Sequence, residues 1–147
     1  MPPQTPLTSL LLVEDNAAHA LLLAAALEEL AVAYQLEVIV NGFHAAARLQ
    51  LPPLPDIVLM DMHLPRMNGV EVIQALGGRL MEVNVVLWSA AHNPLAAVEA
   101  AAVGVDPYLE KPSTSRRSLE VLGRVLTLQR LPLGFRVAAW ERHQGQG

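Results

Sequence analysis

Polar side chains capable of phosphoryl chemistry follow apolar runs at four points of the chain. Glu14 and Asp15 follow the first run and Asp61 follows the second, while Ser89 and Lys111 end two later runs. Carboxylate oxygens are ligands that Mg²⁺ prefers, and an ammonium and a hydroxyl can bind phosphoryl oxygens. The residue types therefore predict a site for a magnesium ion and a phosphoryl group.

Lys111 stands out because it is the single lysine among ten basic residues. An ammonium is a compact point charge on a flexible stem, and it suits one phosphate or carboxylate oxygen better than the planar guanidinium does. Composition alone leaves chance as the alternative, because some position must hold a single lysine.

Length and composition favour one compact domain. The chain has 147 residues, is 52% hydrophobic and 16% charged, and contains no cysteine, which excludes disulfides and thiolate chemistry. Its opening residues resemble neither a secretory signal nor a membrane span. We expect a cytoplasmic protein that does not enter a membrane. We divide it into a flexible N-terminus (1–7), one domain (8–130) and a C-terminal extension (131–147).

Charge is distributed unevenly along the sequence. Residues 1–112 carry four basic and twelve acidic groups, whereas residues 113–147 carry six arginines and two glutamates. A basic end could bind nucleic acid. Because no aromatic platform or DNA-binding motif accompanies it, we expect a solvated face or a protein contact, and no nucleic acid.

Apolar runs alternate with helical patterns, which is typical of a parallel sheet with helices on both faces. Strands are expected at about 9–14, 34–40, 56–60, 83–88 and 108–110, the second and fifth at edges and the third central. Helices are expected at about 17–30, 42–50, 69–76 and 94–104, and from 113–115 to 129.

Helix faces and caps can also be predicted. Asn16 should cap the first helix, whose apolar stripe is read as Ala18, Leu21, Leu22 and Ala25. Ser113, Thr114 or Ser115 should cap the last helix. That helix carries two apolar stripes, Leu119, Leu122 and Leu126 against Val121, Val125 and Leu128. One stripe should cover the sheet, and the second suggests a partner.

Ligands of open parallel sheets bind at the carboxyl ends of the strands. Glu14, Asp15 and Asp61 all follow strands, so we expect them to lie together. Three carboxylates repel one another unless a cation joins them, and hard oxygen ligands favour Mg²⁺. Lys111 and Ser89 would complete the rim and bind the oxygens of a phosphoryl group.

Four motifs in order resemble the receiver domains of two-component response regulators. They are Leu-Leu-Val-Glu-Asp-Asn at 11–16, Asp-Ile-Val-Leu-Met-Asp-Met-His-Leu-Pro-Arg-Met-Asn-Gly-Val-Glu-Val at 56–72, Trp-Ser-Ala at 88–90 and Gly-Val-Asp-Pro-Tyr-Leu-Glu-Lys-Pro at 104–112. The resemblance covers about residues 8–130. It implies a flavodoxin-like, doubly wound α/β fold with a five-stranded parallel sheet in the order 2-1-3-4-5.

The resemblance also implies a role for each site residue. Asp61 would accept a phosphoryl group from a sensor histidine kinase, and Glu14, Asp15, Asp61 and the backbone carbonyl of His63 would bind Mg²⁺. Lys111 would pair with Asp61 and later with its phosphate. Ser89 would bond the phosphate and Tyr108 would turn inward behind it. The Lys111–Pro112 peptide would be cis. Such a protein is a signalling phosphoacceptor that assists its own phosphorylation and dephosphorylation, not an enzyme.

Some positions differ from the common receiver pattern or carry no motif. Asn68 stands where many relatives have aspartate, and Trp88 is bulky for its place before Ser89. The five histidines show no metal-binding spacing, and we read all except His63 as surface or capping residues.

The output is expected to be protein–protein contact. The seventeen residues after 130 are too few for a DNA-binding or catalytic domain, and they carry Leu133, Val137 and Trp140 at helical spacing. We hypothesise a homodimer through the last helix and the tail; a helix folded back on its own domain is the alternative. The opening Val-Glu-Asp-Asn-Ala-Ala-His-Ala-Leu-Leu-Leu and the tail also resemble the stand-alone, CheY-like regulators that are paired with bacterial phytochromes.

Two other classes remain open from the residues alone. A phosphatase of the haloacid-dehalogenase type also combines aspartate, lysine and Mg²⁺, but it has Asp-x-Asp where this chain has Asp61 and His63. A receiver-like binding module that is never phosphorylated is the second alternative. The complete set of acids, hydroxyl and lysine argues against it.

Overall fold

The computed structural model describes residues 7–30, 33–89, 109–110 and 114–125. Five strands form one parallel sheet in the order β2-β1-β3-β4-β5. They are β1 (Thr8–Val13), β2 (Tyr34–Ile39), β3 (Ile57–Asp61), β4 (Asn84–Ser89) and β5 (Leu109–Glu110). The predicted fold class and strand order are confirmed, with β3 at the centre and β2 and β5 at the edges.

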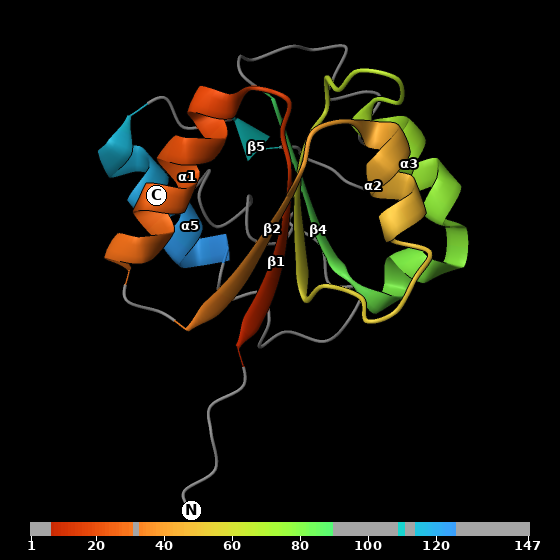
Figure 1. Ribbon diagram of the computed structural model, residues 1–147, viewed down its shortest axis with the longest axis horizontal. Helices are drawn as coiled ribbons and strands as arrows, with labels where there is room; N and C mark the ends of the chain where they lie inside the picture. Colours follow the sequence, from red (N-terminus) through yellow and green to blue (C-terminus); the bar gives the residue numbers. More distant parts are fainter. Residues whose placement is uncertain (1–6, 31–32, 90–108, 111–113, 126–147) are drawn as a thin grey trace, which may run out of the picture.

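Helices cover both faces of this sheet. They are α1 (Ala17–Glu29), α2 (Gly42–Arg48), α3 (Gly69–Leu76) and α5 (Ser115–Val125), and a 3₁₀ helix, η1, spans Gly77–Glu82. α1 and α5 pack together on one face, and α2 and α3 pack together on the other (Figure 1). The helix predicted at 94–104 lies outside the described residues. No helix in the described part of the chain is both long and apolar enough to cross a membrane.

The central strands are the most deeply buried elements. Leu10–Val13 of β1 and Ile57–Met60 of β3 expose 1% of their surface or less. Parallel strands covered on both faces require such continuous apolar runs, because every side chain meets a helix layer. β2 has no fully buried residue and exposes Gln35, Glu37 and Val38, as expected of an edge strand.

The predicted core stripe of α1 is wrong. The structure buries Leu23, Ala26 and Leu27, whereas Leu21 is 72% exposed. The helix is apolar on nearly every side, so its sequence pattern carries little information about which side faces the sheet. The predicted cap is confirmed, because Asn16 Oδ1 accepts a hydrogen bond from the backbone N–H of His19 at 3.1 Å.

Of the three residues predicted to cap α5, the structure shows Thr114 as the N-cap. Thr114 Oγ1 accepts from the backbone N–H of Arg117 at 3.1 Å, which is N-cap geometry. Val121 and Leu122 are both buried although we assigned them to different stripes. The prediction that one stripe would be left for a partner is therefore wrong for these two residues. The later members of both stripes, Leu126 and Leu128, lie outside the described residues.

The loop between β3 and α3 is fixed against the start of α2. The backbone N–H of Gly42 donates to the Pro65 carbonyl at 3.3 Å, and Met67 N–H donates to the same oxygen at 2.8 Å. Arg66 adopts a left-handed conformation, with φ of 70°, and its guanidinium carbon lies 4.5 Å from the centroid of the Phe43 ring. The loop that follows Asp61 is thus held by backbone bonds and by a cation–π contact.

α3 begins with a complete capping box. Asn68 Oδ1 accepts from Glu71 N–H at 2.8 Å, and Glu71 Oε1 accepts from Asn68 N–H at 3.0 Å. The asparagine that differs from the common receiver pattern therefore supplies the helix cap, as an aspartate would.

Candidate functional site

Strand register places two site positions, Glu14 and Asp61, at the same end of the sheet. Val13 of β1 pairs with Met60 of β3, and Asp61 of β3 pairs with Trp88 of β4. Glu14 follows Val13 directly, so it lies beside Asp61 at the carboxyl ends of neighbouring strands. This edge is where open parallel sheets bind ligands.

The structure brings Glu14, Asp15 and Asp61 together. One carboxylate oxygen from each lies within 4.8 Å of the others. Glu14 and Asp61 are only 1% and 5% exposed, whereas Asp15 is exposed. Three acids at this spacing repel one another strongly, so the cluster favours the binding of a cation.

The donor set fits a hard divalent cation. Every candidate side-chain ligand is a carboxylate oxygen, and two of the three are presented from buried, fixed positions. Mg²⁺, Ca²⁺ and Mn²⁺ prefer oxygen ligands, whereas zinc sites are usually built from nitrogen and sulfur. The described residues offer no cysteine or histidine ligand in this cluster.

Glu14 is fixed by two contacts from the start of α1, one from its N-cap Asn16 and one from His19 in its first turn. Its Oε1 accepts from the backbone N–H of Asn16 at 3.1 Å, and its Oε2 lies 3.3 Å from Nδ1 of His19. The Glu14 side chain has no solvent exposure. A buried carboxylate needs such donors, because burying a charge without partners is costly.

Asp61 is oriented by its own loop. Its Oδ1 accepts from the backbone N–H of His63 at 2.8 Å. Gly69, at the start of α3, approaches this strand end so closely that a Cβ there would lie 2.7 Å from the Asp61 carbonyl oxygen. The backbone around Asp61 is therefore packed against a helix start as well as hydrogen-bonded.

The remaining predicted site residues are described only in part. Ser89 ends β4, and its backbone pairs with Glu110 of β5. His63 supplies the N–H just described, and its side chain is exposed. Tyr108, Lys111 and the peptide between Lys111 and Pro112 lie outside the described residues.

His19 is a site residue that the sequence analysis missed. We read it as a surface or capping residue, but its side chain is 15% exposed and contacts Glu14. One signal could have identified it. Side chains of a helix lean toward the N-terminus, and His19 occupies the first turn of α1, directly above the strand end that carries Glu14.

An apolar groove adjoins the acids. Glu14 and Asp15 form one end of it, and α1 and the end of β2 form its walls. Its apolar residues include Leu21, Val38 and Val40, which are 72%, 44% and 55% exposed. An exposed apolar surface beside a polar site is typical of a surface that contacts another protein.

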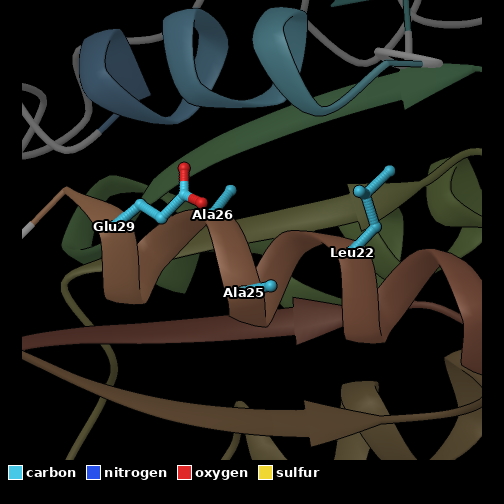
Figure 2. A pocket seen from close by; sticks show the side chains of 4 residues that line it. All are labelled: Leu22, Ala25, Ala26 and Glu29. Atoms are coloured by element: carbon cyan, nitrogen blue, oxygen red, sulfur yellow. The ribbon is translucent and has the colours of Figure 1, made fainter.

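A second, smaller cavity carries no comparable chemistry. It measures about 40 Å³ and is lined by Leu22, Ala25, Ala26 and Glu29. Figure 2 shows that the side chains of Leu22, Ala26 and Glu29 rise from α1 on the side that faces α5. This cavity offers a single carboxylate, lies away from the strand ends, and is read as a packing gap between two helices.

Comparisons with known proteins agree on one family. Residues 10–122 match the response regulator receiver domain. The probable methanogenesis regulatory protein FilR2 of Methanothrix harundinacea is 34% identical over 110 residues, which cover 70% of this chain and 71% of FilR2.

Solved structures are also similar. The Mn²⁺-bound form of response regulator Rcp1 has a TM-score of 0.71 at 25% identity, covering 82% of this chain and 92% of that one. The bacteriophytochrome response regulator AtBRR has a TM-score of 0.67 at 27% identity, covering 82% and 94%. Other relatives are longer: the chain spans 53% of the phosphate regulon regulator PhoB of Rhizobium meliloti.

Proposed function

Because this chain belongs to the family of response regulator receiver domains, we propose that its Asp61 accepts a phosphoryl group from a phosphohistidine on a sensor histidine kinase. Receiver domains are the phosphoacceptors of two-component signalling and do not turn over external substrates as ordinary enzymes do. The observation that carries the assignment is the place of Asp61: it is a buried carboxylate at the end of the central strand, within 4.8 Å of two other acids.

The proposed transfer is a nucleophilic substitution at phosphorus. An oxygen of the Asp61 carboxylate attacks the phosphorus of the phosphoimidazole, and an acyl phosphate forms as the phosphorus–nitrogen bond breaks. The imidazole nitrogen of the kinase takes the bonding electrons. The bond from His63 N–H to Asp61 Oδ1 holds the attacking carboxylate in one orientation before the donor arrives.

The family binds a divalent metal ion at its acidic pocket, and we propose Mg²⁺ for this chain. Glu14, Asp15 and Asp61 would be the side-chain ligands, with the backbone carbonyl of His63 as a further one. A cation held there would offset the negative charge that gathers when a phosphoryl group meets three carboxylates. The hard oxygen donors of the cluster support this choice.

We assign the other side of the phosphoryl group to Lys111 and Ser89. In the chain Lys111 directly follows Glu110, whose backbone pairs with Ser89 on β4. The ammonium would pair with Asp61 and then with its phosphate, and the hydroxyl would bond a phosphate oxygen. Tyr108, two residues before Glu110, would follow the movement of Ser89 as the conformational switch.

Incubation with MgCl₂ and a small phosphodonor, followed by intact-mass and peptide mass spectrometry, tests this function. We expect one phosphoryl group per chain, located on the peptide that contains Asp61, and no gain in EDTA. Continuous release of product from unrelated phosphoesters would instead support a phosphatase of the haloacid-dehalogenase type. No gain in mass under any condition would support a binding module that is never phosphorylated.

We assign the docking of the kinase to the apolar groove between α1 and β2. The groove ends at Glu14 and Asp15, so a partner lying in it would bring its phosphohistidine to the acids. We expect Leu21→Asp to slow phosphotransfer from the cognate kinase by at least about tenfold, because it places a charge in an apolar contact surface. Phosphorylation by a small phosphodonor should not change.

Leu51→Asp is the matched control for this substitution. Leu51 is 63% exposed and lies beyond α2, away from the groove. It should leave both rates unaltered. Equal rates of phosphotransfer from the kinase to Leu21→Asp and to the unaltered chain would contradict the proposed docking surface. The assignment of Asp61 as the acceptor would not be affected.

The nature of the kinase is a narrower proposal. AtBRR is a bacteriophytochrome response regulator, and RcpA, which shares the fold, is a cyanobacterial phytochrome response regulator. We propose that a phytochrome-type histidine kinase phosphorylates this chain. Phosphotransfer that depends on red or far-red illumination of such a kinase would support the pairing, and transfer from none of a panel of phytochrome kinases would contradict it.

For the output we propose protein–protein contact by a homodimer. Residues 8–130 would form the receiver and 131–147 an extension that carries apolar Leu133, Val137 and Trp140. Val121 and Leu122 are already used by the core, so they are not available to the dimer contact. Multi-angle light scattering should give a dimeric mass, and deletion of residues 131–147 should give a monomer. A monomeric mass in both phosphorylation states would contradict this proposal.

A further inference from the structure

His19 lies between the acid cluster and the end of β4. Its Nδ1 is 3.3 Å from Oε2 of Glu14, and its ring centroid lies 5.6 Å from that of Trp88 at an angle of 60°. Trp88 has no exposed surface, and its backbone pairs with Asp61. One imidazole therefore contacts a proposed metal ligand on one side and the residue before Ser89 on the other.

Two buried nitrogen atoms in this group lack a hydrogen-bond partner among the described residues. They are Nε2 of His19 and Nε1 of Trp88. Buried polar atoms are nearly always paired, so two such atoms on neighbouring rings require an explanation.

The chemistry of the two atoms is complementary. A neutral histidine that donates its Nδ1 proton to Glu14 has a lone pair on Nε2, and an indole nitrogen is only a donor. A water molecule that bridges Trp88 Nε1–H and His19 Nε2 would satisfy both atoms at once. It would complete a chain of contacts from Glu14 through His19 to Trp88.

We propose that His19 is a positioning residue that holds the Glu14 carboxylate for the divalent cation and couples the cation site to Trp88. The inference rests on the proposed function, because it needs Glu14 to be a ligand. Metal-binding carboxylates are themselves held by hydrogen bonds, and loss of such a partner typically weakens metal affinity 10- to 100-fold. Trp88 precedes Ser89 on β4. A cation bound at the acids would therefore affect the strand that carries the proposed phosphate-binding hydroxyl.

Two substitutions of His19 separate the two parts of this role. His19→Leu removes both nitrogens and replaces the ring with an apolar side chain of similar bulk. His19→Asn retains an amide donor near the position of Nδ1 but has nothing in the place of Nε2. We expect His19→Leu to bind Mg²⁺ about tenfold more weakly, and His19→Asn to bind it within about twofold of the unaltered chain.

Calorimetric titration of the full chain with MgCl₂ measures the affinity. The indole N–H resonance of Trp88 in a ¹H–¹⁵N spectrum measures the coupling; the resonance is assigned by its persistence in Trp140→Phe, because the chain has two tryptophans. We expect Mg²⁺ to shift the Trp88 resonance in the unaltered chain. Neither His19 variant should show the shift at saturating Mg²⁺.

His44→Leu is the matched control. His44 contacts Asn41 at the start of α2, on the other face of the sheet, and should leave affinity and resonance unchanged. Thermal melting establishes that each variant is folded.

Unchanged Mg²⁺ affinity in a folded His19→Leu would overturn the positioning role. The coupling would be overturned if Mg²⁺ did not shift the Trp88 resonance in the unaltered chain, or if it still shifted that resonance in His19→Asn. Neither result affects the assignment of Asp61. An unaltered chain that binds no divalent cation would instead overturn the proposed function, and this inference with it.

Discussion

Replacing Asp61 with asparagine is expected to abolish phosphorylation of the chain. Under the conditions in which the unaltered protein gains one phosphoryl group, the Asp61→Asn variant should gain none. An amide of nearly the same shape can occupy the same buried place at the end of β3, but it lacks the nucleophilic carboxylate oxygen that an acyl phosphate requires. The expected loss is therefore chemical and needs no change of fold.

The same variant should bind Mg²⁺ more weakly. Asp61 supplies one of three carboxylates within 4.8 Å of one another. Removing one negative ligand should lower the affinity by about tenfold or more, since the charge of the ligand set governs the affinity of such sites. Calorimetric titration with MgCl₂ measures the difference.

Asp56→Asn is the matched control for both measurements. Asp56 immediately precedes β3, at the opposite end from the acid cluster, and its Oδ2 accepts from the backbone N–H of Ser9 at 2.7 Å. The Asp56→Asn variant should still gain one phosphoryl group and should bind Mg²⁺ as the unaltered chain does. A phosphoryl group that still appeared on Asp61→Asn, or that vanished equally in Asp56→Asn, would refute the assignment of the acceptor.

The Gly42→Ala variant is expected to lose about 3 kcal/mol of unfolding free energy, more than an ordinary surface substitution would cost. A Cβ on Gly42 would overlap the carbonyl oxygen of Met67 and meet two further Met67 atoms. The contact is with backbone, so the loop between β3 and α3 must move. The gain in helix propensity from alanine, about 1 kcal/mol, is too small to offset this.

Thermal and urea unfolding would measure the effect, with a fall in melting temperature of about 6–12 °C for a domain of this size. Gly78→Ala is the control, because a Cβ at Gly78 would meet nothing within 4 Å. It should change the free energy of unfolding by less than about 0.5 kcal/mol. Equal stability of the two variants would mean that the β3–α3 loop is not held against α2.

Strand order and the level of the acids could be predicted because they depend on strong sequence signals. Continuous apolar runs mark the buried central strands, and the first polar residues after them must emerge at the carboxyl edge. Glu14 and Asp61 follow this rule, which is why a pattern of residue types alone placed them together.

The orientation of α1 could not be predicted in the same way. Its residues are apolar on almost every side, so the sequence permits several buried faces, and packing against α5 and the sheet selects Leu23, Ala26 and Leu27. The choice also decides which apolar side chains remain outside. Leu21 is left on the surface beside the acids for this reason.

The contacts of single side chains were also difficult to predict from the sequence. His19 approaches Glu14 from the first turn of α1, and Arg66, which is left-handed, lies over the Phe43 ring. Neither contact depends on periodicity. Such contacts follow from tertiary packing. For His19 the sequence gives its place in the first helical turn after Glu14 but not the contact itself.

The unequal exposure of the three acids has a consequence for the path of an arriving ion. Glu14 is already held by two contacts, so less side-chain entropy would be lost there when an ion binds than at the exposed Asp15. Asp15 would offer the ion an exposed carboxylate at the open rim, and Glu14 and Asp61 would offer the two buried ones. Substitution at residue 15 should therefore alter the rate of capture, whereas substitution at residue 14 should alter the rate of escape.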